Sequence, residues 1–257
     1  MLGAIAGDVI GSVDEVVNVK TTEFPLFHEH CRFTDDTVPT VALADSLLHG
    51  APYVDLLKRY YRAYPRAGYG GMFHRWAASG DSLLYHSYGN GSAMRISPVG
   101  FAFGTLEEVL EQAKRSAEVT HDHPEGIKGA QAVASAVFLA RTGRDKVHIQ
   151  AYLETAFGYD LGTPLDEIRE TYEFDVSCQG SVPQAIRAFL ESDDFEDAIR
   201  RAISLGGDSD TIACMAGGIA QAFHGGVPEG IAHRVDEILD EPLDEVSRRF
   251  TEAFACP

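Results

Sequence analysis

Apolar residues recur along most of this chain at the three- and four-residue spacing of a helix. Such spacing predicts helices, because positions three and four apart lie on one helical face. Another helix is predicted to follow Asp193-Asp194 and to end at Gly206-Gly207. Strong strand alternation is absent, and short extended pieces are expected only at 101–103 and 173–176. The sequence therefore predicts an all-α fold, and its clearest helical ranges are 38–48, 106–119, 127–141, 147–157, 182–190 and 210–223.

The remaining stretches are interpreted by composition. The apolar start of the chain has no basic residues before it and is interrupted by Asp8, which indicates a buried helix rather than a signal peptide. Residues 63–104 are rich in Gly, Tyr and Ser, which is typical of long functional loops broken by short helices. Because no repeat or linker interrupts the chain, we expect one compact domain over residues 1–257.

Charge and cysteine usage exclude several classes of function. The formal net charge of -18 should repel nucleic acid and anionic membranes, so neither is expected as a partner. No apolar run is long enough to span a bilayer. The four cysteines show no paired spacing, which argues against a zinc cage or a disulfide framework and favours the cytoplasm. Nothing in the sequence indicates an oligomeric state.

Two similar acidic segments stand out, Thr34-Asp35-Asp36-Thr37 and Asp208-Ser209-Asp210-Thr211. Each lies where a loop is predicted to enter a helix, so simple N-capping is one interpretation. Both segments hold more oxygen ligands than one cap needs. Hard oxygen ligands without His or Cys favour Mg²⁺, Mn²⁺ or Ca²⁺ over zinc, and together the segments could hold two ions.

Two further motifs carry weaker signals. The segment 87–95 reads SYGNGSAMR, and its Asn-Gly turn exposes backbone N–H groups that suit a phosphate, although an ordinary turn has the same sequence. His121 and His123 could ligate zinc, but no Cys or Glu motif accompanies them. A ligand contact or a helix-terminus cap is the better interpretation of this pair.

Five ordered motifs give the chain a family resemblance: GAIAGDVIGSVDE, FTDDT, YGNGSAMR, THDHPEG and GGDSDTIACMAGGIAQAFHG. In this order they resemble the ADP-ribosylglycohydrolase family. The resemblance implies a compact orthogonal helical fold with a binuclear Mg²⁺ centre, where Mn²⁺ is an alternative metal. The implied metal ligands are Thr34, Asp35, Asp36, Asp208, Asp210 and Thr211. The implied substrate-binding residues are Ser87, Tyr88, Gly89, Asn90, Gly91 and His121.

The same resemblance implies a reaction. The enzyme would release ADP-ribose from an ADP-ribosylated protein or a small ADP-riboside by cleaving the glycosidic bond at C1 of the ribose. The expected catalytic residues are Asp35, Asp36 and Glu15, with Asp14 as a possible substitute for Glu15. By analogy an arginine acceptor is favoured over a serine, an acetyl ester or a small riboside, and loops at 21–30 and 51–85 are expected to shape that choice.

Two alternative functions remain open on the sequence. One is a metal-dependent nucleotide pyrophosphohydrolase, which would release AMP, because clustered Asp residues and Mg²⁺ suit that chemistry equally well. The other is a non-catalytic protein that binds ADP-ribose without turnover. The intact acidic segments argue against the second alternative.

Overall fold

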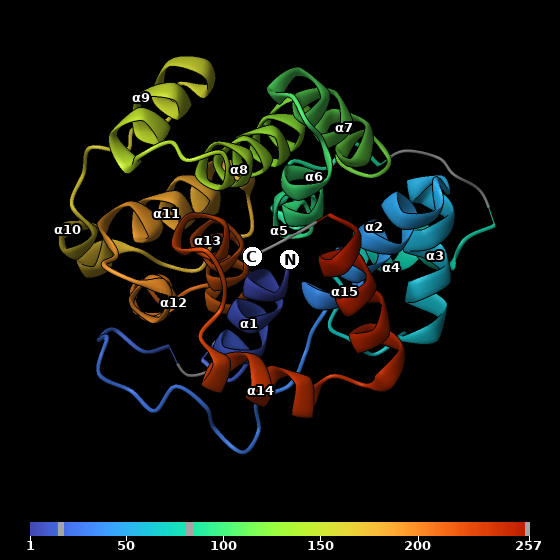
Figure 1. Ribbon diagram of the computed structural model, residues 1–257, viewed down its shortest axis with the longest axis horizontal. Coiled ribbons are helices and arrows are strands. Elements are labelled where there is room, and N and C mark those ends of the chain that lie inside the picture. The colour runs from blue at the N-terminus through green and yellow to red at the C-terminus, as the bar shows by residue number, and fades with distance from the viewer. Residues whose placement is uncertain (15–17, 81–84, 255–257) are drawn as a thin grey trace.

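The computed structural model describes residues 1–14, 18–80 and 85–254, and helices make up most of these ranges (Figure 1). The described part contains no β-strand, only an isolated bridge between Gly89 and Ser177. The predicted all-α fold is therefore confirmed. Its helices are α1 (Leu2–Gly11), α2 (Thr37–His49), α3 (Tyr53–Ala63), α4 (Gly71–Ala78), α5 (Gly91–Met94), α6 (Ser97–Ala102), α7 (Leu106–Glu118), α8 (Pro124–Arg141), α9 (Lys146–Phe157), α10 (Leu165–Thr171), α11 (Cys178–Glu191), α12 (Phe195–Ile203), α13 (Ser209–His224), α14 (Glu229–Ile238) and α15 (Glu241–Ala253).

The predicted helices are all present, and one local expectation was wrong. Residues 101–103 do not form an extended piece, because Phe101 and Ala102 complete the last turn of α6. The loops expected between residues 51 and 85 are interrupted by α3 and α4, and α4 is one of the short helices expected within 63–104. Helix α12 ends at Ile203, slightly before the two glycines that were expected to stop it.

Local sequence explains where several helices begin and end. Thr105 and Glu108 form a capping box at the start of α7, in which each side chain bonds the other residue's backbone N–H. Gly50, Gly158 and Gly225 close α2, α9 and α13 in the left-handed conformation that glycine adopts without strain. These ends come from local chemistry, independent of the packing of the core.

Helices α1 and α13 lie at the centre of the molecule, with α11 and α12 on one side and α2, α3 and α15 on the other (Figure 1). A stripe of glycines on α1 allows their backbones to touch. A Cβ atom on Gly3 would lie 2.4 Å from the Gly217 carbonyl oxygen, and one on Gly11 would lie 2.6 Å from the Cα atom of Asp210. Because Gly3 faces the end of α13 and Gly11 faces its beginning, the two helices are antiparallel.

This antiparallel pairing positions the candidate site. It places the last turns of α1 beside the first turn of α13, and the start of α2 packs against the same turns of α1. The ends of three helices that are far apart in sequence therefore meet at one point. Buried apolar side chains around these helices, from Met1 to Phe250, form a continuous hydrophobic cluster. No helix in the described ranges is long and apolar enough to cross a membrane.

Candidate active site

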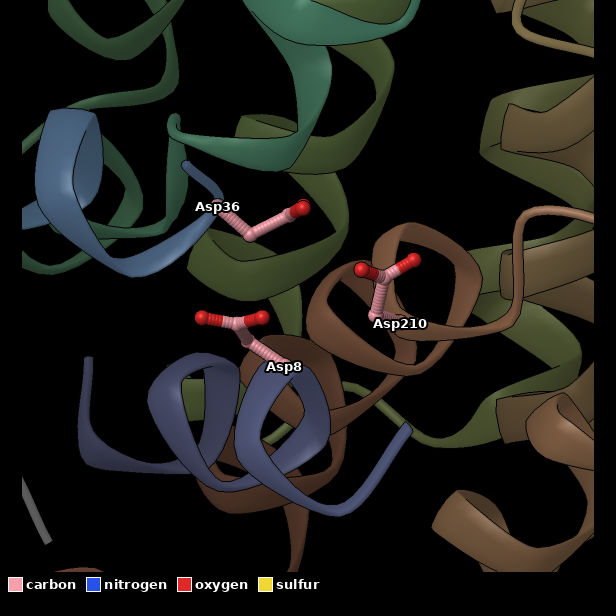
Figure 2. Close-up of side chains that lie close together, drawn as sticks. All are labelled: Asp8, Asp36 and Asp210. Atoms are coloured by element: carbon pink, nitrogen blue, oxygen red, sulfur yellow. The ribbon is translucent and has the colours of Figure 1, made fainter. Parts of the chain in front are cut away.

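Three buried carboxylates meet where α1, α2 and α13 converge (Figure 2). Asp8 comes from α1, Asp36 precedes α2, and Asp210 lies in the first turn of α13. One oxygen from each lies within 4.8 Å of the others. Figure 2 shows the carboxylates extending from the three helices into one shared space. The two acidic segments of the sequence are thus brought together, with Asp8 as a third contributor.

Asp8 fixes the loop that carries the first acidic segment. Its Oδ1 atom accepts a hydrogen bond from the Thr34 hydroxyl at 2.6 Å. Its Oδ2 atom accepts from the backbone N–H groups of Thr34 at 2.9 Å and Thr37 at 3.1 Å, and the Thr37 hydroxyl donates to it as well. Both carboxylate oxygens are therefore engaged, and Asp8 acts by holding the start of α2 in place.

The N-capping interpretation of the acidic segments can be compared with true caps in the same chain. Asp145, Asp194 and Asp240 each occupy an N-cap position and accept a hydrogen bond from a backbone N–H of the helix that follows. Asp36 and Asp208 also occupy N-cap positions, but neither side chain makes a capping bond. Capping therefore does not explain why carboxylates occupy these two positions.

Asp36 is buried among the neighbouring carboxylates of Asp8, Asp208 and Asp210. Its Oδ2 atom accepts from the Thr211 hydroxyl at 3.1 Å and lies 3.4 Å from the Thr34 hydroxyl, whose proton goes to Asp8, whereas its buried Oδ1 atom has no hydrogen-bond partner in the described ranges. Burial, and next the charge of Asp210, raise the pKa of Asp36 well above 3.8. Buried carboxylates this close are costly unless a cation neutralises them. The orphaned oxygen and the all-oxygen donor set fit a hard divalent cation.

Two acids of the cluster, Asp36 and Asp210, line a cavity of about 570 Å³. Asp35 is only partly buried and also lines the cavity, so its carboxylate is accessible from that space. All six predicted metal ligands contribute to the lining, namely Thr34, Asp35, Asp36, Asp208, Asp210 and Thr211.

The cavity wall beside the cluster is formed by the segment that precedes α5. Five of the six residues expected to bind substrate line this wall: Ser87, Gly89, Asn90, Gly91 and His121. The Asn90 side-chain amide donates to Asp208 Oδ2 at 2.6 Å, so the turn is tied directly to the acid cluster. Tyr88 points elsewhere: it is 53% exposed, and its ring centre lies 5.4 Å from that of His123.

The model of one protein family, ADP-ribosylglycohydrolase, matches residues 1–256 of the chain. The chain belongs to the ADP-ribosylglycohydrolase family. The family resemblance that the sequence motifs carried is thereby confirmed, and the protein is a glycohydrolase enzyme.

Individual relatives agree with this assignment. The chain is 29% identical over 307 residues to mouse (Mus musculus) ADP-ribosylhydrolase ARH3, a match that covers 88% of this chain and 82% of that protein. It is 26% identical to ADP-ribosylarginine hydrolase Tri1 of Pseudomonas putida (strain GB-1), with 88% and 69% covered. A solved structure titled ADP-ribosylglycohydrolase-related protein complex superposes with a TM-score of 0.71 at 27% identity, covering 98% of this chain and 96% of that one. These likenesses support hydrolysis of ADP-ribosyl linkages by this family member.

Sequence reasoning missed the part that Asp8 plays in this glycohydrolase. Asp8 was interpreted only as an acid that interrupts an apolar helix. The available signal was an ionisable side chain inside an apolar helix that was itself predicted to be buried, because a buried acid needs hydrogen-bond partners. Of the two acids proposed near the start of the chain, Glu15 lies outside the described residues. Asp14 is described and does not line the cavity.

Proposed function

We propose that this glycohydrolase requires Mg²⁺ and releases ADP-ribose from an acceptor, with an arginine side chain as the preferred acceptor. The observation that carries the proposal is the buried acid cluster beside the cavity, with one oxygen of Asp36 unpartnered among the described residues. Two Mg²⁺ ions, or Mn²⁺ in their place, would be held by Thr34, Asp35, Asp36, Asp208, Asp210 and Thr211. Bound there, the ions supply positive charge that offsets the carboxylates and orients the ribose hydroxyls.

The chain's own residues then account for the remaining chemistry. The bond between ribose C1 and the acceptor nitrogen breaks, and the oxygen of a water molecule bonds to C1. Asp35 accepts one proton of that water, since it is the partly exposed acid in the cavity, while Asp36 is buried. The proton held by Asp35 passes to the departing nitrogen, so the products are ADP-ribose and the free acceptor, and the carboxylate is regenerated. Positive charge that develops on the ribose is stabilised by the neighbouring carboxylates.

The cavity mouth offers apolar surface for the rest of the ligand. Met72, Phe174 and Val176 are among the exposed large apolar side chains of the described ranges, and all three line the cavity. Exposed apolar side chains gathered at a cavity indicate a binding surface. A flat adenine ring suits this surface, while the diphosphate lies along the wall formed by Ser87 to Gly91.

The arginine acceptor is proposed on two grounds. One relative, Tri1, is named for ADP-ribosylarginine, although the ARH3 relatives carry no acceptor in their name. The net charge of -18 also favours approach of a cationic acceptor over an anionic one.

The decisive experiment measures free ADP-ribose released from arginine-linked and serine-linked ADP-ribosyl peptides, with Mg²⁺ and with a chelator. We expect release from the arginine linkage that stops when the chelator is added. The Asp210→Asn variant should lose turnover and keep its fold. Asp145→Asn is the matched control, because it makes the same change at an exposed N-cap where Asn caps equally well, and it should retain full activity.

Other products would redirect the proposal. Release from the serine linkage alone would keep the hydrolase and change the acceptor. AMP instead of ADP-ribose would indicate a pyrophosphohydrolase. Binding of ADP-ribose without turnover of any linkage would indicate a non-catalytic binder, and full activity of Asp210→Asn would refute the metal assignment.

A further inference from the structure

Arg95 is a buried cation without a counter-ion. It is 1% exposed, lines the cavity and forms no ion pair with any carboxylate in the described ranges. Its Nη2 atom donates to the Ser116 carbonyl at 3.1 Å and to the Thr120 hydroxyl oxygen at 2.8 Å, while its Nε atom has no partner there. Burial lowers the pKa of Arg95 to about 10, so the guanidinium remains charged at neutral pH. A buried charge without a counter-ion destabilises the fold, which indicates that Arg95 has a functional role.

The contact with Thr120 determines what that hydroxyl can do. A guanidinium only donates, so Thr120 Oγ1 must accept from Arg95 and is left with one proton of its own to donate. His121 Nδ1 lies 2.7 Å from this oxygen. Tyr85 is the other group near Thr120, but no hydrogen bond of normal geometry joins the two hydroxyls in the described ranges. Thr120 Oγ1 has a second lone pair, so its contact with Nδ1 fits either tautomer of His121, and the occupation of one lone pair by Arg95 favours the arrangement in which Thr120 donates.

A ring that accepts at Nδ1 carries its proton on Nε2 when it is neutral. His121 is neutral, because burial, and to a lesser extent the charge of Arg95, hold its pKa well below 6.5. Its Nε2 atom faces the cavity wall: a Cβ atom on Gly91 would lie 3.2 Å from Nε2, and one on Gly89 would lie 3.6 Å from it. No hydrogen bond joins Nε2 to a described residue, so this donor is available to a ligand.

We propose that Arg95 and Thr120 are positioning residues that fix the Nε2–H tautomer of His121, so that the ring donates a hydrogen bond to the diphosphate of ADP-ribose. This role rests on the proposed substrate. The diphosphate is the natural recipient, because the adjacent guanidinium makes this wall favourable to anions. This anion-binding wall adjoins the acid cluster, since Asn90 lies between Gly89 and Gly91 and bonds Asp208.

The tautomer can be observed directly. Nitrogen-15 NMR of histidine-labelled protein distinguishes a protonated from an unprotonated ring nitrogen, and a His121→Gln variant identifies the signal. The matched pair of variants is Thr120→Ser, which keeps the hydroxyl, and Thr120→Val, which removes it at nearly constant volume. We expect Nε2–H in the wild type and in Thr120→Ser, and a mixture of tautomers in Thr120→Val.

Binding completes the test. Calorimetric titration with ADP-ribose in Mg²⁺ should show Kd weakened roughly tenfold in Thr120→Val and nearly unchanged in Thr120→Ser, as expected for loss of one charge-assisted hydrogen bond. Titration with Mg²⁺ alone should give wild-type affinity in both, which shows that the acid cluster is intact. Arg95→Lys, which keeps the charge, should retain the tautomer if it folds.

Two results would overturn the proposed positioning of His121 by Arg95 and Thr120. One is Nδ1–H in the wild-type protein, and the other is equal ADP-ribose affinity in Thr120→Val and Thr120→Ser. A wild-type protein that shows the Nε2–H tautomer and does not bind ADP-ribose would instead contradict the proposed function, so the two failures are distinguishable.

Discussion

Replacing Asp36 by Asn should stabilise the metal-free protein while it abolishes turnover. The three carboxylates each place an oxygen within 4.8 Å of the others, and at an effective dielectric constant of about 20 two charges at that limit repel each other by about 3.5 kcal/mol. Asn removes the ionisable group of Asp36 at nearly constant volume, so it removes this repulsion, or the free-energy cost of protonating Asp36 where the metal-free protein avoids the repulsion in that way. The Asn carbonyl oxygen still accepts from the Thr211 hydroxyl. Its new amide group can donate to Asp210 or Asp8, where Asp36 itself repels them.

The expected gain is smaller than the full repulsion. A new buried N–H group that found no acceptor would cost about 1–3 kcal/mol, so a net stabilisation of about 2 kcal/mol is expected. In a chain of this size each kcal/mol raises Tm by about 2–4 °C. Calorimetric melting in chelator should therefore place Tm of Asp36→Asn several degrees above that of the wild type. In Mg²⁺ the order should reverse, because only the wild type gains free energy from binding the ion.

The matched control lies in the same helix. Asp45 is also buried in α2, but its carboxylate lies 2.7 Å from His49 Nδ1 and accepts from the Tyr60 hydroxyl at 3.0 Å. Asp45→Asn removes a partnered acid, so it should leave the stability unchanged or lower it by up to about 1 kcal/mol. If Asp36→Asn melted below the wild type in chelator with its helical content intact, the repulsion argument would be refuted.

Two further predictions test the packing and the buried histidine. Gly11→Ala places a Cβ atom 2.6 Å from the Cα atom of Asp210, so the free energy of unfolding in denaturant should fall by about 1–3 kcal/mol and kcat should fall as well. The control is Gly230→Ala, at a helical position with open space around it, where the free energy of unfolding should rise by about 0.5–1 kcal/mol. An undiminished kcat in Gly11→Ala would mean that α1 does not position Asp210. Because the pKa of His121 is held well below 6.5, the unfolded chain binds its proton first, so stability should fall by up to about 1.4 kcal/mol per pH unit as pH drops below about 6.5. Urea unfolding across this range should show that part of the slope missing in His121→Gln, and equal slopes would contradict the neutral ring.

Much of the fold followed from periodicity, and the exceptions have physical reasons. The range now occupied by α3 has Leu57 and Tyr61 on its buried face at helical spacing, but it was not among the predicted helices, because its many long polar and aromatic side chains weaken the apolar pattern. Residues 101–103 include two aromatic residues that favour strands, but packing places Phe101 and Ala102 in the last turn of α6. Boundaries set by local caps, such as Gly50 after α2, were predictable from the sequence alone.

The composition of the candidate site was predictable, while its geometry was not. The dense carboxylates around Asp36 and Asp210 are visible in the sequence as a pattern within each segment. Their meeting depends on the close contact of α1 and α13, and the glycines at positions 3, 7 and 11 were the visible signal of that contact. Arg95 and Asp8 were passed over for the same reason, since a charged residue inside an apolar motif reveals its partners only after the chain is folded.

The convergence of helix ends also decides whether the acid cluster could be stable without a cation. The positive ends of the α2 and α13 dipoles point at the carboxylates, and each favours a nearby negative charge by about 0.3–1 kcal/mol. The Thr211 hydroxyl adds a hydrogen bond to Asp36. Two charges at the 4.8 Å limit of the cluster repel by about 3.5 kcal/mol, and Asp8 and Asp210 both act on Asp36. The pKa of Asp36 is still raised well above 3.8 by burial and by these neighbouring charges, so the hydroxyl and the dipoles do not balance them. Protonation of Asp36 relieves the repulsion in the metal-free protein, but a protonated Asp36 is no longer a charged metal ligand. A divalent cation relieves the same repulsion and keeps every carboxylate charged and in place for the reaction.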